Sequence, residues 1–235
     1  MTAMAPRVRP DVLVFDVNET LIDIESLNPY FTAIFGDPGV LREWFGQLVT
    51  YSMTVTVSDC YVDFFLLGQS VLRMVAEYRG VELADGDIAA LADAMATMPA
   101  HPEVAGALSR LHDDGYRLVA LTNSPAREGR PTPLENAGLS GYFERQFSVH
   151  ELRVFKPAPV LYRHTARELG VRPGECMMVA AHVWDTVGAQ AAGFGGALIT
   201  RPGNAPLRAL GVPYPDFVAT DLVDLAAQLA YAFEK

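Results

Sequence analysis

The sequence predicts an α/β protein with a mostly parallel sheet and an inserted block of helices. The first observation is an apolar run, Val12–Phe15, that leads directly into Asp16, as in a parallel strand buried on both faces. The second is helical spacing of apolar residues through 22–98 without a strand pattern. The third is an alternation of strand and helix patterns over 99–235. We expect about five to six strands, a core of residues 1–21 and 99–235, and a helical cap of residues 22–98.

The predicted insert consists of amphipathic helices. Its apolar residues recur at steps of three and four, which place them on one face of a helix. A shorter helix is expected around Leu91, and Pro99 and Pro102 end the block. These faces form either the interior of the insert or, in part, a homodimer interface, and the pattern leaves both open. The three main apolar sets are Phe31, Ile34, Phe35; Leu41, Trp44, Phe45, Leu48, Val49; and Phe64, Phe65, Leu67, Val71, Leu72, Val75.

Polar side chains follow the apolar runs of the later chain. Strands are expected at Tyr116–Leu121, Phe147–Val149, Cys176–Ala181 and Gly195–Thr200, and helices lie between them at Val104–His112, Leu134–Ala137, around Val160–Leu169 and at Val187–Ala192. Because the carboxyl ends of parallel strands meet at one edge of a sheet, we expect the residues beyond them to converge. The candidate set is Asp16, Thr20, Thr122, Asn123, Lys156, His182 and Asp185.

Each candidate also has a purely structural interpretation. Asp16 can be a covalent nucleophile that forms an ester, or it can cap the turn after the strand. Thr122 and Asn123 can be the caps of a helix. Lys156 can be a solvated surface residue and His182 a hydrogen-bonded packing residue. The convergence of the whole set at strand ends favours a catalytic site.

Composition excludes several classes of protein. Half of the 235 residues are hydrophobic, so a disordered chain is not expected. The formal net charge of −10 argues against nucleic acid or an anionic membrane as the main partner, although local cations can still bind a small anionic substrate. Cys60 and Cys176 lie far apart, which suits reduced thiols. The N-terminal residues lack the apolar core of a signal peptide, and we expect a cytoplasmic protein.

Four motifs occur in an order that resembles the haloacid dehalogenase (HAD) superfamily over nearly the whole chain. They are Phe15-Asp16 with Thr20-Leu21, Leu121-Thr122-Asn123-Ser124, Lys156-Pro157, and a strand that ends in Trp184-Asp185. Further motifs are similar to the type II 2-haloacid dehalogenases, namely Leu41–Trp44, Tyr162 six residues after Lys156, and Val183–Ala189. The resemblance implies a Rossmann-like core with an inserted helical cap and hydrolysis of carbon–halogen bonds.

The resemblance also implies a role for each residue. Asp16 attacks C2 of a short 2-haloalkanoate opposite the halogen, which inverts C2, and Lys156 keeps Asp16 ionised. Asp185, with or without His182, activates the water that hydrolyses the aspartyl ester. The remaining residues bind the substrate: Thr122 and Asn123 hold its carboxylate at a helix N-terminus, Arg42 and Asn123 receive the halide, and Thr20, Tyr162 and Trp184 line the site.

Three positions depart from the pattern of these dehalogenases. Asn18 stands where the superfamily's phosphatases carry a proton-donating Asp and where type II members often carry an aromatic residue. A halide leaving group needs no proton, so Asn18 favours the dehalogenase. Well-described members have Asn at the position of His182 and Ser at that of Ala180. With a pKa of about 6.5, His182 is suited to be a general base, or it marks a different substrate.

Other functions remain open from the residues alone. The same ester chemistry suits another leaving group, either an azetidine carboxylate whose ring is opened or a phosphomonoester hydrolysed with Mg²⁺. A non-catalytic binding protein of the same fold is a further alternative. We expect no cofactor for the dehalogenase, and Mg²⁺ only for the phosphatase. The expected partners are the haloacid and its halide product.

Overall fold

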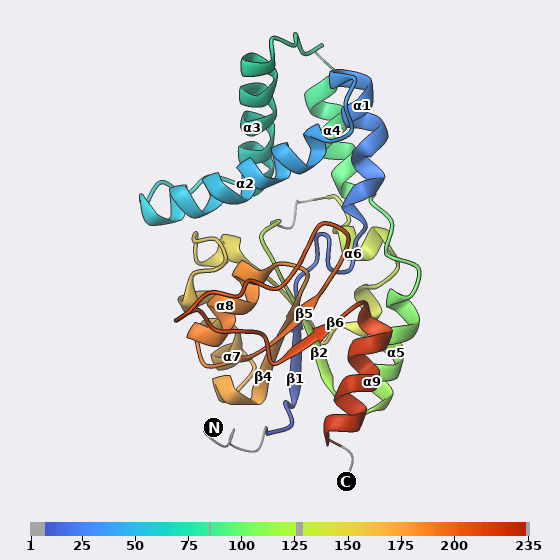
Figure 1. Ribbon diagram of the computed structural model, residues 1–235, viewed down its shortest axis with the longest axis vertical. Helices are drawn as coiled ribbons and strands as arrows, with labels where there is room; N and C mark the ends of the chain where they lie inside the picture. Colours follow the sequence, from blue (N-terminus) through green and yellow to red (C-terminus); the bar gives the residue numbers. More distant parts are fainter. Residues whose placement is uncertain (1–7, 85, 126–128, 234–235) are drawn as a thin grey trace.

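The computed structural model describes residues 8–84, 86–125 and 129–233. Six strands form one sheet in the order β3-β2-β1-β4-β5-β6, and every neighbouring pair is parallel (Figure 1). The predicted α/β fold with its mostly parallel sheet is therefore confirmed. The expected ends of the core at 1–7 and 234–235 lie outside the described residues. The strands are β1 (Val12–Phe15), β2 (Arg117–Thr122), β3 (Arg145–Ser148), β4 (Cys176–Ala180), β5 (Gly195–Ile199) and β6 (Phe217–Ala219).

Strand β1 lies at the centre of the sheet and carries Asp16 at its carboxyl end. Val14 is in register with Val119 of β2 and Met178 of β4. All four residues of β1 are completely buried, because alternate side chains pack into the apolar layers on the two faces of the sheet. The backbone N–H of Asp16 donates to the carbonyl of Val179 at 3.0 Å, so the pairing with β4 extends to the carboxylate.

Helices cover both faces of this sheet. In Figure 1, α5 (Val104–Asp113) and α9 (Leu222–Phe233) lie on one side, and α7 (Pro159–Glu168) and α8 (Val183–Ala191) on the other. Each presents its apolar side chains to the sheet, as amphipathic helices in a doubly covered parallel sheet do. The short elements are α6 (Pro133–Asn136), η1 (Ile24–Leu27), η2 (Ser140–Tyr142), η3 (Val149–Glu151) and η4 (Pro173–Glu175).

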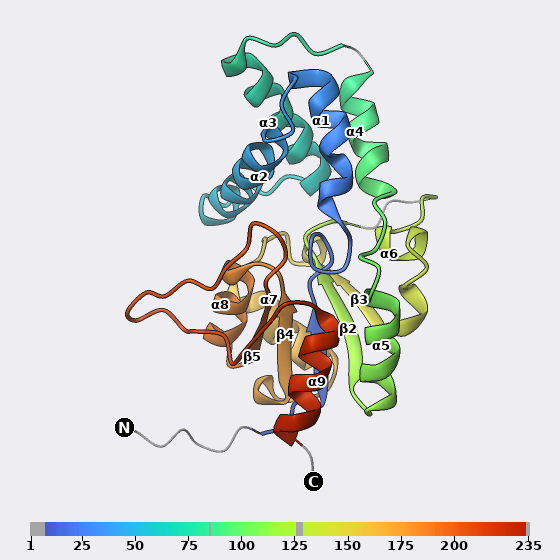
Figure 2. The ribbon, with the colours of Figure 1, turned by 45° about the vertical axis from the view of Figure 1, so that its right-hand side comes forward.

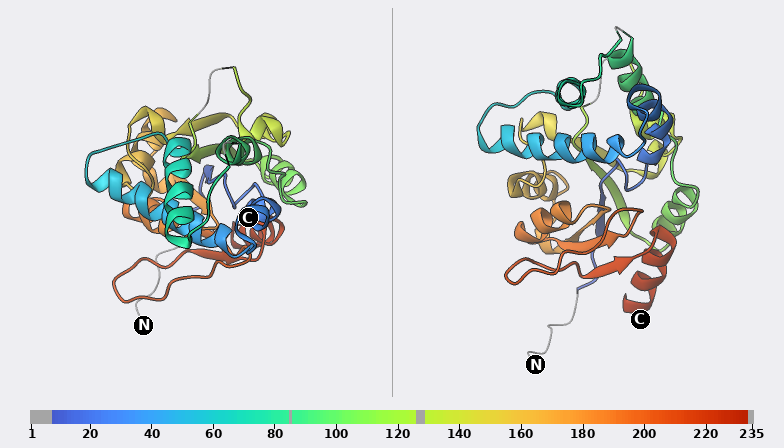
Figure 3. Two further views of the ribbon diagram at one scale, coloured as in Figure 1. Left: turned by 90° about the horizontal axis from the view of Figure 1, so that it is seen from above. Right: turned by 45° about the horizontal axis from the view of Figure 1, so that its top comes forward.

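Four further helices lie beyond the carboxyl ends of the strands (Figures 1 and 2). Seen from above, they lie in front of the sheet (Figure 3). Trp44 is fully buried between two of them, and its indole N–H donates to the carbonyl of Gly68 at 2.9 Å. None of the helices in the described ranges is long and apolar enough to cross a bilayer. The four are α1 (Asn28–Phe35), α2 (Val40–Val57), α3 (Phe64–Arg79) and α4 (Asp87–Ala96).

The structure corrects the bounds of one predicted strand, locates a sixth strand that the sequence did not locate, and removes one alternative interpretation. Strand β3 is Arg145–Ser148 rather than Phe147–Val149, since Val149 begins a short 3₁₀ helix. The sixth strand, Phe217–Ala219, has only three residues and no alternating pattern that would show it in the sequence. No helix begins at Asn123, because the next described helix starts at Pro133, with Thr132 as its cap.

Helix α8 packs tightly on the segment that carries Lys156, which makes Gly188 a test of the fold. A Cβ at Gly188 would lie against the carbonyl oxygen of Pro157 and 2.5 Å from the Cβ of Pro157. We therefore expect Gly188→Ala to lower the free energy of unfolding by about 2 kcal/mol in urea denaturation, as overpacking does. Gly106 of α5 is the matched control, because nothing lies within 4 Å of its added Cβ. Gly106→Ala should instead gain up to about 1 kcal/mol, and equal losses in both variants would contradict the prediction.

Candidate active site

The carboxylate of Asp16 is almost completely buried and has partners at both oxygens. Oδ1 accepts from Nζ of Lys156 at 2.7 Å, and Oδ2 accepts from Oγ1 of Thr20 at 2.7 Å. Burial alone would raise the pKa of Asp16, but the Lys156 charge and the neighbouring His182 outweigh it and hold that pKa well below its usual value. Asp16 is therefore ionised at neutral pH, as a nucleophile requires.

Lys156 lies between two carboxylates. Its side chain is fully buried, and Nζ donates to Asp16 Oδ1 at 2.7 Å, Asp185 Oδ2 at 2.7 Å and the Leu121 carbonyl at 2.9 Å. These three acceptors match the three protons of an ammonium group. Burial would lower the pKa of Lys156, but the two carboxylates raise it overall. Lys156 is therefore a buried cation held in place by three acceptors. The alternative interpretation of Lys156 as a solvated surface residue is wrong.

Asp185 is completely buried next to Lys156. Its Oδ1 accepts from the hydroxyl of Tyr162 at 2.5 Å. Burial and the negative charge of Asp16 raise the pKa of Asp185. Tyr162 is itself fully buried, and burial and Asp185 raise its pKa well above the usual value. The structure thus places Tyr162 behind Asp185 and not on a wall open to substrate, where we had predicted it.

Thr20 and Asn123 connect the strand ends. Oγ1 of Thr20 donates to Asp16 and accepts from the backbone N–H of Ala181 at 2.9 Å, so it ties β1 to β4. Oδ1 of Asn123 accepts from the backbone N–H of Lys156 at 3.3 Å. Together with the contacts of Lys156, these hydrogen bonds join Thr20, Asn123, Lys156 and Asp185 into one group around Asp16.

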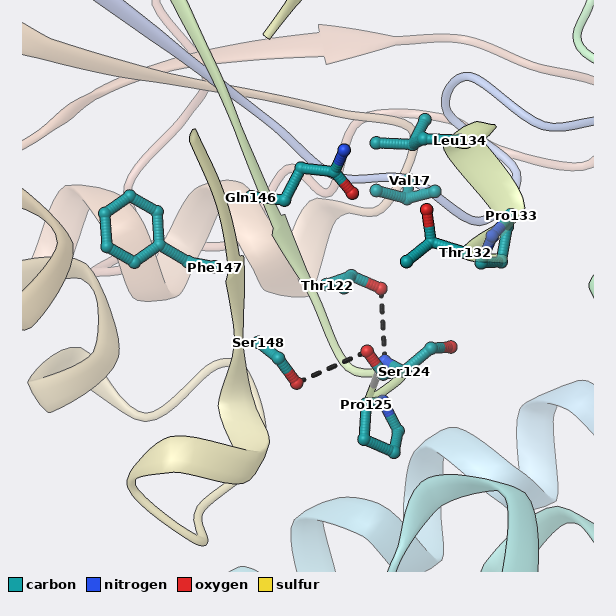
Figure 4. A pocket seen from close by; sticks show the side chains of 10 residues that line it. All are labelled: Val17, Thr122, Ser124, Pro125, Thr132, Pro133, Leu134, Gln146, Phe147 and Ser148. Atoms are coloured by element: carbon teal, nitrogen blue, oxygen red, sulfur yellow. Dashed lines mark hydrogen bonds between the residues drawn. The ribbon is translucent and has the colours of Figure 1, made fainter. Parts of the chain in front are cut away.

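Thr122 points into a separate cavity beside this group. Figure 4 shows the cavity, of about 70 Å³, between the carboxyl ends of β2 and β3 and the start of α6. Oγ1 of Thr122 accepts from the backbone N–H of Ser124 at 3.1 Å, and Ser148 donates to the Ser124 carbonyl at 3.3 Å. Val17, the residue after Asp16, also lines it. The cavity adjoins the Asp16 loop without including Asp16 itself.

His182 contacts two carboxylates and two aromatic rings. Nε2 lies 2.8 Å from Oε2 of Glu19, and Nδ1 lies 3.3 Å from Oδ2 of Asp16. The Trp184 ring stacks on the imidazole with centroids 4.9 Å apart, and Phe45 of α2 lies at 5.6 Å. Burial would lower the pKa of His182, but the contacts with Asp16 and Glu19 outweigh it and raise it to about 9. The expectation of a neutral base with an ordinary pKa is corrected, because this imidazole is charged at neutral pH.

Arg42 is bound to acidic side chains. Its guanidinium contacts Glu19 and Glu25 and donates to the Pro202 carbonyl at 2.9 Å. Within the described ranges it forms neither a hydrogen bond nor an ion pair with Asp16 or Asn123. The structure therefore pairs Arg42 with acidic side chains, and its role as a receptor of the halide together with Asn123 stays a prediction.

Glu19 is the residue that the sequence reasoning missed. It is only 2% exposed, adopts a left-handed backbone with φ of 67°, and pairs with His182 and Arg42. Asn204 also donates to its Oε1 at 2.7 Å. Only its place within the first motif hinted at a role, because its partners come from distant parts of the chain.

The carboxylates of this site do not form part of a metal-binding cluster within the described residues. Over residues 8–84, 86–125 and 129–233, no group of three or more His, Cys, Asp or Glu side chains is arranged to hold a metal ion. One oxygen of each carboxylate, Oδ1 of Asp16 and Oδ2 of Asp185, accepts from the Lys156 ammonium group.

Known proteins share this sequence pattern and this fold. Residues 10–193 match the family described as haloacid dehalogenase-like hydrolase. (S)-2-haloacid dehalogenase 1 from Pseudomonas sp. (strain CBS-3) is 31% identical over 80% of this chain and 83% of its own length. (S)-2-haloacid dehalogenase 4A from Burkholderia cepacia is 29% identical over 82% of this chain and 84% of its own. The structure of L-2-haloacid dehalogenase RSc1362 superimposes with a TM-score of 0.86 at 28% identity and covers 94% of this chain and 99% of that chain.

The charge on His182 makes the stability of the fold depend on pH. The pKa of His182 is about 6.5 in an unfolded chain and about 9 in the folded protein. The folded protein therefore binds the proton of this imidazole more tightly than the unfolded chain does. The stabilisation is fully present below pH 6.5 and is lost as the pH rises through 9. We expect the free energy of unfolding to fall by about 3 kcal/mol over this window in urea denaturation at fixed pH.

The control for this titration is His182→Gln, which removes the imidazole. Its stability should be nearly independent of pH between 6.5 and 9. A wild-type protein whose stability stays flat over the same window would contradict the assignment.

Proposed function

Because the chain belongs to the haloacid dehalogenase-like hydrolase family, as its match over residues 10–193 shows, we propose that it hydrolyses short 2-haloalkanoic acids through an ester on Asp16. The observation that carries this proposal is the buried Lys156, with Nζ 2.7 Å from both Asp16 and Asp185. It provides an ionised nucleophile and a second carboxylate within one fixed group. The relatives named above are (S)- and L-2-haloacid dehalogenases, which supports the L enantiomer as substrate.

The first step is displacement of the halide. An oxygen of Asp16 attacks C2 opposite the halogen, so the carbon–halogen bond breaks as the ester bond forms and C2 is inverted. The halide leaves as an anion and needs no proton, which agrees with the amide at Asn18, engaged with Ser124 Oγ at 3.3 Å. Lys156 offsets the repulsion between the carboxylate and an anionic substrate.

The second step is hydrolysis of the ester. Water attacks Cγ of Asp16, and Asp185 takes its proton; the raised pKa of Asp185 suits a base. The C2–O bond is retained, so the product is a 2-hydroxy acid of inverted configuration. Because Lys156 already places a positive charge between the two carboxylates, we propose that both steps proceed without Mg²⁺.

The helices α1–α4 act as a cap over this site in our proposal. Phe45 of α2 lies 5.6 Å from the His182 ring, and Arg42 of the same helix contacts Glu19. These contacts exclude water from the displacement step, where a drier site strengthens the charge interactions.

Halide release is the direct test of the activity. We expect chloride from L-2-chloropropionate in the presence of EDTA and none from the D enantiomer. Brief exposure to substrate should add a mass that maps to Asp16 in a peptide digest. Asp16→Asn should abolish both turnover and the added mass and should leave the circular dichroism spectrum unchanged. Turnover by that variant, or turnover that requires Mg²⁺, would refute the mechanism.

The hydrogen bond between Tyr162 and Asp185 tests the second step. Tyr162→Phe removes a donor from a buried carboxylate, and we expect ester hydrolysis to slow by about 10- to 100-fold. Because displacement does not use this bond, the ester on Asp16 should accumulate and be visible by intact mass. Tyr142→Phe, beside the start of β2, is the matched control. A Tyr162→Phe enzyme without accumulated ester would show that Asp185 does not serve this step.

A further inference from the structure

The side chain of Glu19 lies at the meeting point of three segments. It contacts Arg42 of α2, His182 at the start of α8, and Asn204 of the loop after β5. The backbone carbonyl of Glu19 also accepts a hydrogen bond from Nε2 of His101 at 3.1 Å. The side chain is 3% exposed, so its charge is screened by these partners and hardly by solvent.

The backbone at Glu19 lies in a region that disfavours side chains other than glycine. A φ of 67° costs roughly 1 kcal/mol for a residue with a Cβ. The carboxylate of the same residue has three side-chain partners, and backbone strain of this kind is concentrated at functional sites.

The two nitrogens of His182 have different surroundings. Nε2 is taken by Glu19 at 2.8 Å. Nδ1 is buried and forms no hydrogen bond among the described residues, although it lies 3.3 Å from Oδ2 of Asp16. The charged groups that face the imidazole are these two carboxylates, and the rings of Trp184 and Phe45 cover its faces. With Nε2 occupied by Glu19, a protonated His182 has one N–H without a hydrogen bond, on the nitrogen that lies 3.3 Å from Oδ2 of Asp16.

We propose that Glu19 is a positioning residue that keeps His182 protonated and turned toward Asp16, so that His182 is a hydrogen-bond donor to the ester and Asp185 alone is the base. The catalytic part of this inference rests on the proposed function. The Glu19–His182 pair itself does not.

The assignment completes the proton balance of ester hydrolysis. Water forms a bond to Cγ and gives one proton to Asp185, and the oxyanion on Cγ accepts from Nδ1–H of His182. Collapse breaks the bond between Cγ and the alkoxide oxygen, and the alkoxide takes the proton from Asp185. Asp16 is left as a carboxylic acid and loses its remaining proton to solvent, because its pKa is held low.

The first test is the titration of the imidazoles by ¹H–¹⁵N NMR without substrate. The chain has five histidines, and the signal lost in His182→Asn identifies His182. Glu19→Gln removes the charge, and Glu19→Gly removes the side chain at a φ that glycine adopts freely. In both variants we expect the midpoint of His182 to fall by at least about one pH unit, a tenfold loss of proton affinity.

Glu25→Gln is the matched control for this titration. Glu25 contacts the same guanidinium of Arg42 but not His182. The His182 midpoint should therefore stay within about 0.3 pH unit of wild type. An unchanged midpoint in both Glu19 variants, or an equal shift in Glu25→Gln, would overturn the pairing.

The second test is the pH profile of halide release. We expect the alkaline limb of kcat to move down by about one pH unit in Glu19→Gln, in step with the His182 midpoint, and KM to change by less than about twofold. A loss of stability alone would lower activity without moving the limb. A shifted midpoint with an unmoved limb would overturn the role of His182 as donor. If the wild-type protein releases no halide, the proposed function fails, and the titration still decides the Glu19–His182 pair.

Discussion

The site depends on the interaction of the Lys156 ammonium group with the carboxylates of Asp16 and Asp185. Two carboxylates and a cation are buried together, and each would be costly to desolvate alone. Nζ reaches Asp16, Asp185 and the Leu121 carbonyl at 2.7 to 2.9 Å, so every proton has an acceptor. These three acceptors lie beyond or within strands β1, β4 and β2. The parallel order of the sheet thus determines that the charges meet.

A second charged group adjoins the first at Asp16. Glu19 joins His182 to Arg42, and His182 returns to Oδ2 of Asp16. In the proposed mechanism, esterification of Asp16 removes one negative charge from the interior while Lys156 and His182 remain cationic. Their N–H groups can then donate hydrogen bonds to the ester, and this donation makes the ester carbon more electrophilic toward water. In this mechanism, the charges that stabilise the resting carboxylate of Asp16 also favour hydrolysis of its ester.

Much of the fold could be predicted from the sequence because burial leaves a periodic pattern. Strands β1, β2 and β4 contain the continuous apolar runs Val12–Phe15, Leu118–Leu121 and Cys176–Ala180, and polar residues follow each run. Strand β6 has three residues, too few for a period, and β3 has two exposed residues, so their bounds could not be predicted. The alternative interpretation of Thr122 and Asn123 as helix caps is wrong, because cap-forming residues also suit turns.

The sequence by itself determined which residues gather at the sheet edge. Asp16 and Asn123 directly follow β1 and β2, and the segments after β1, β3 and β4 carry Thr20, Lys156 and Asp185 to the same edge of the parallel sheet. Only the tertiary structure decided their charges and partners. Glu19 and His182 are 163 positions apart, and no local pattern encodes a contact over that separation. The same holds for Arg42, which is occupied by Glu19 and Glu25, and for Tyr162, which lies behind Asp185. Electrostatic roles depend on burial and on neighbours in space, and a linear pattern specifies neither for a single side chain.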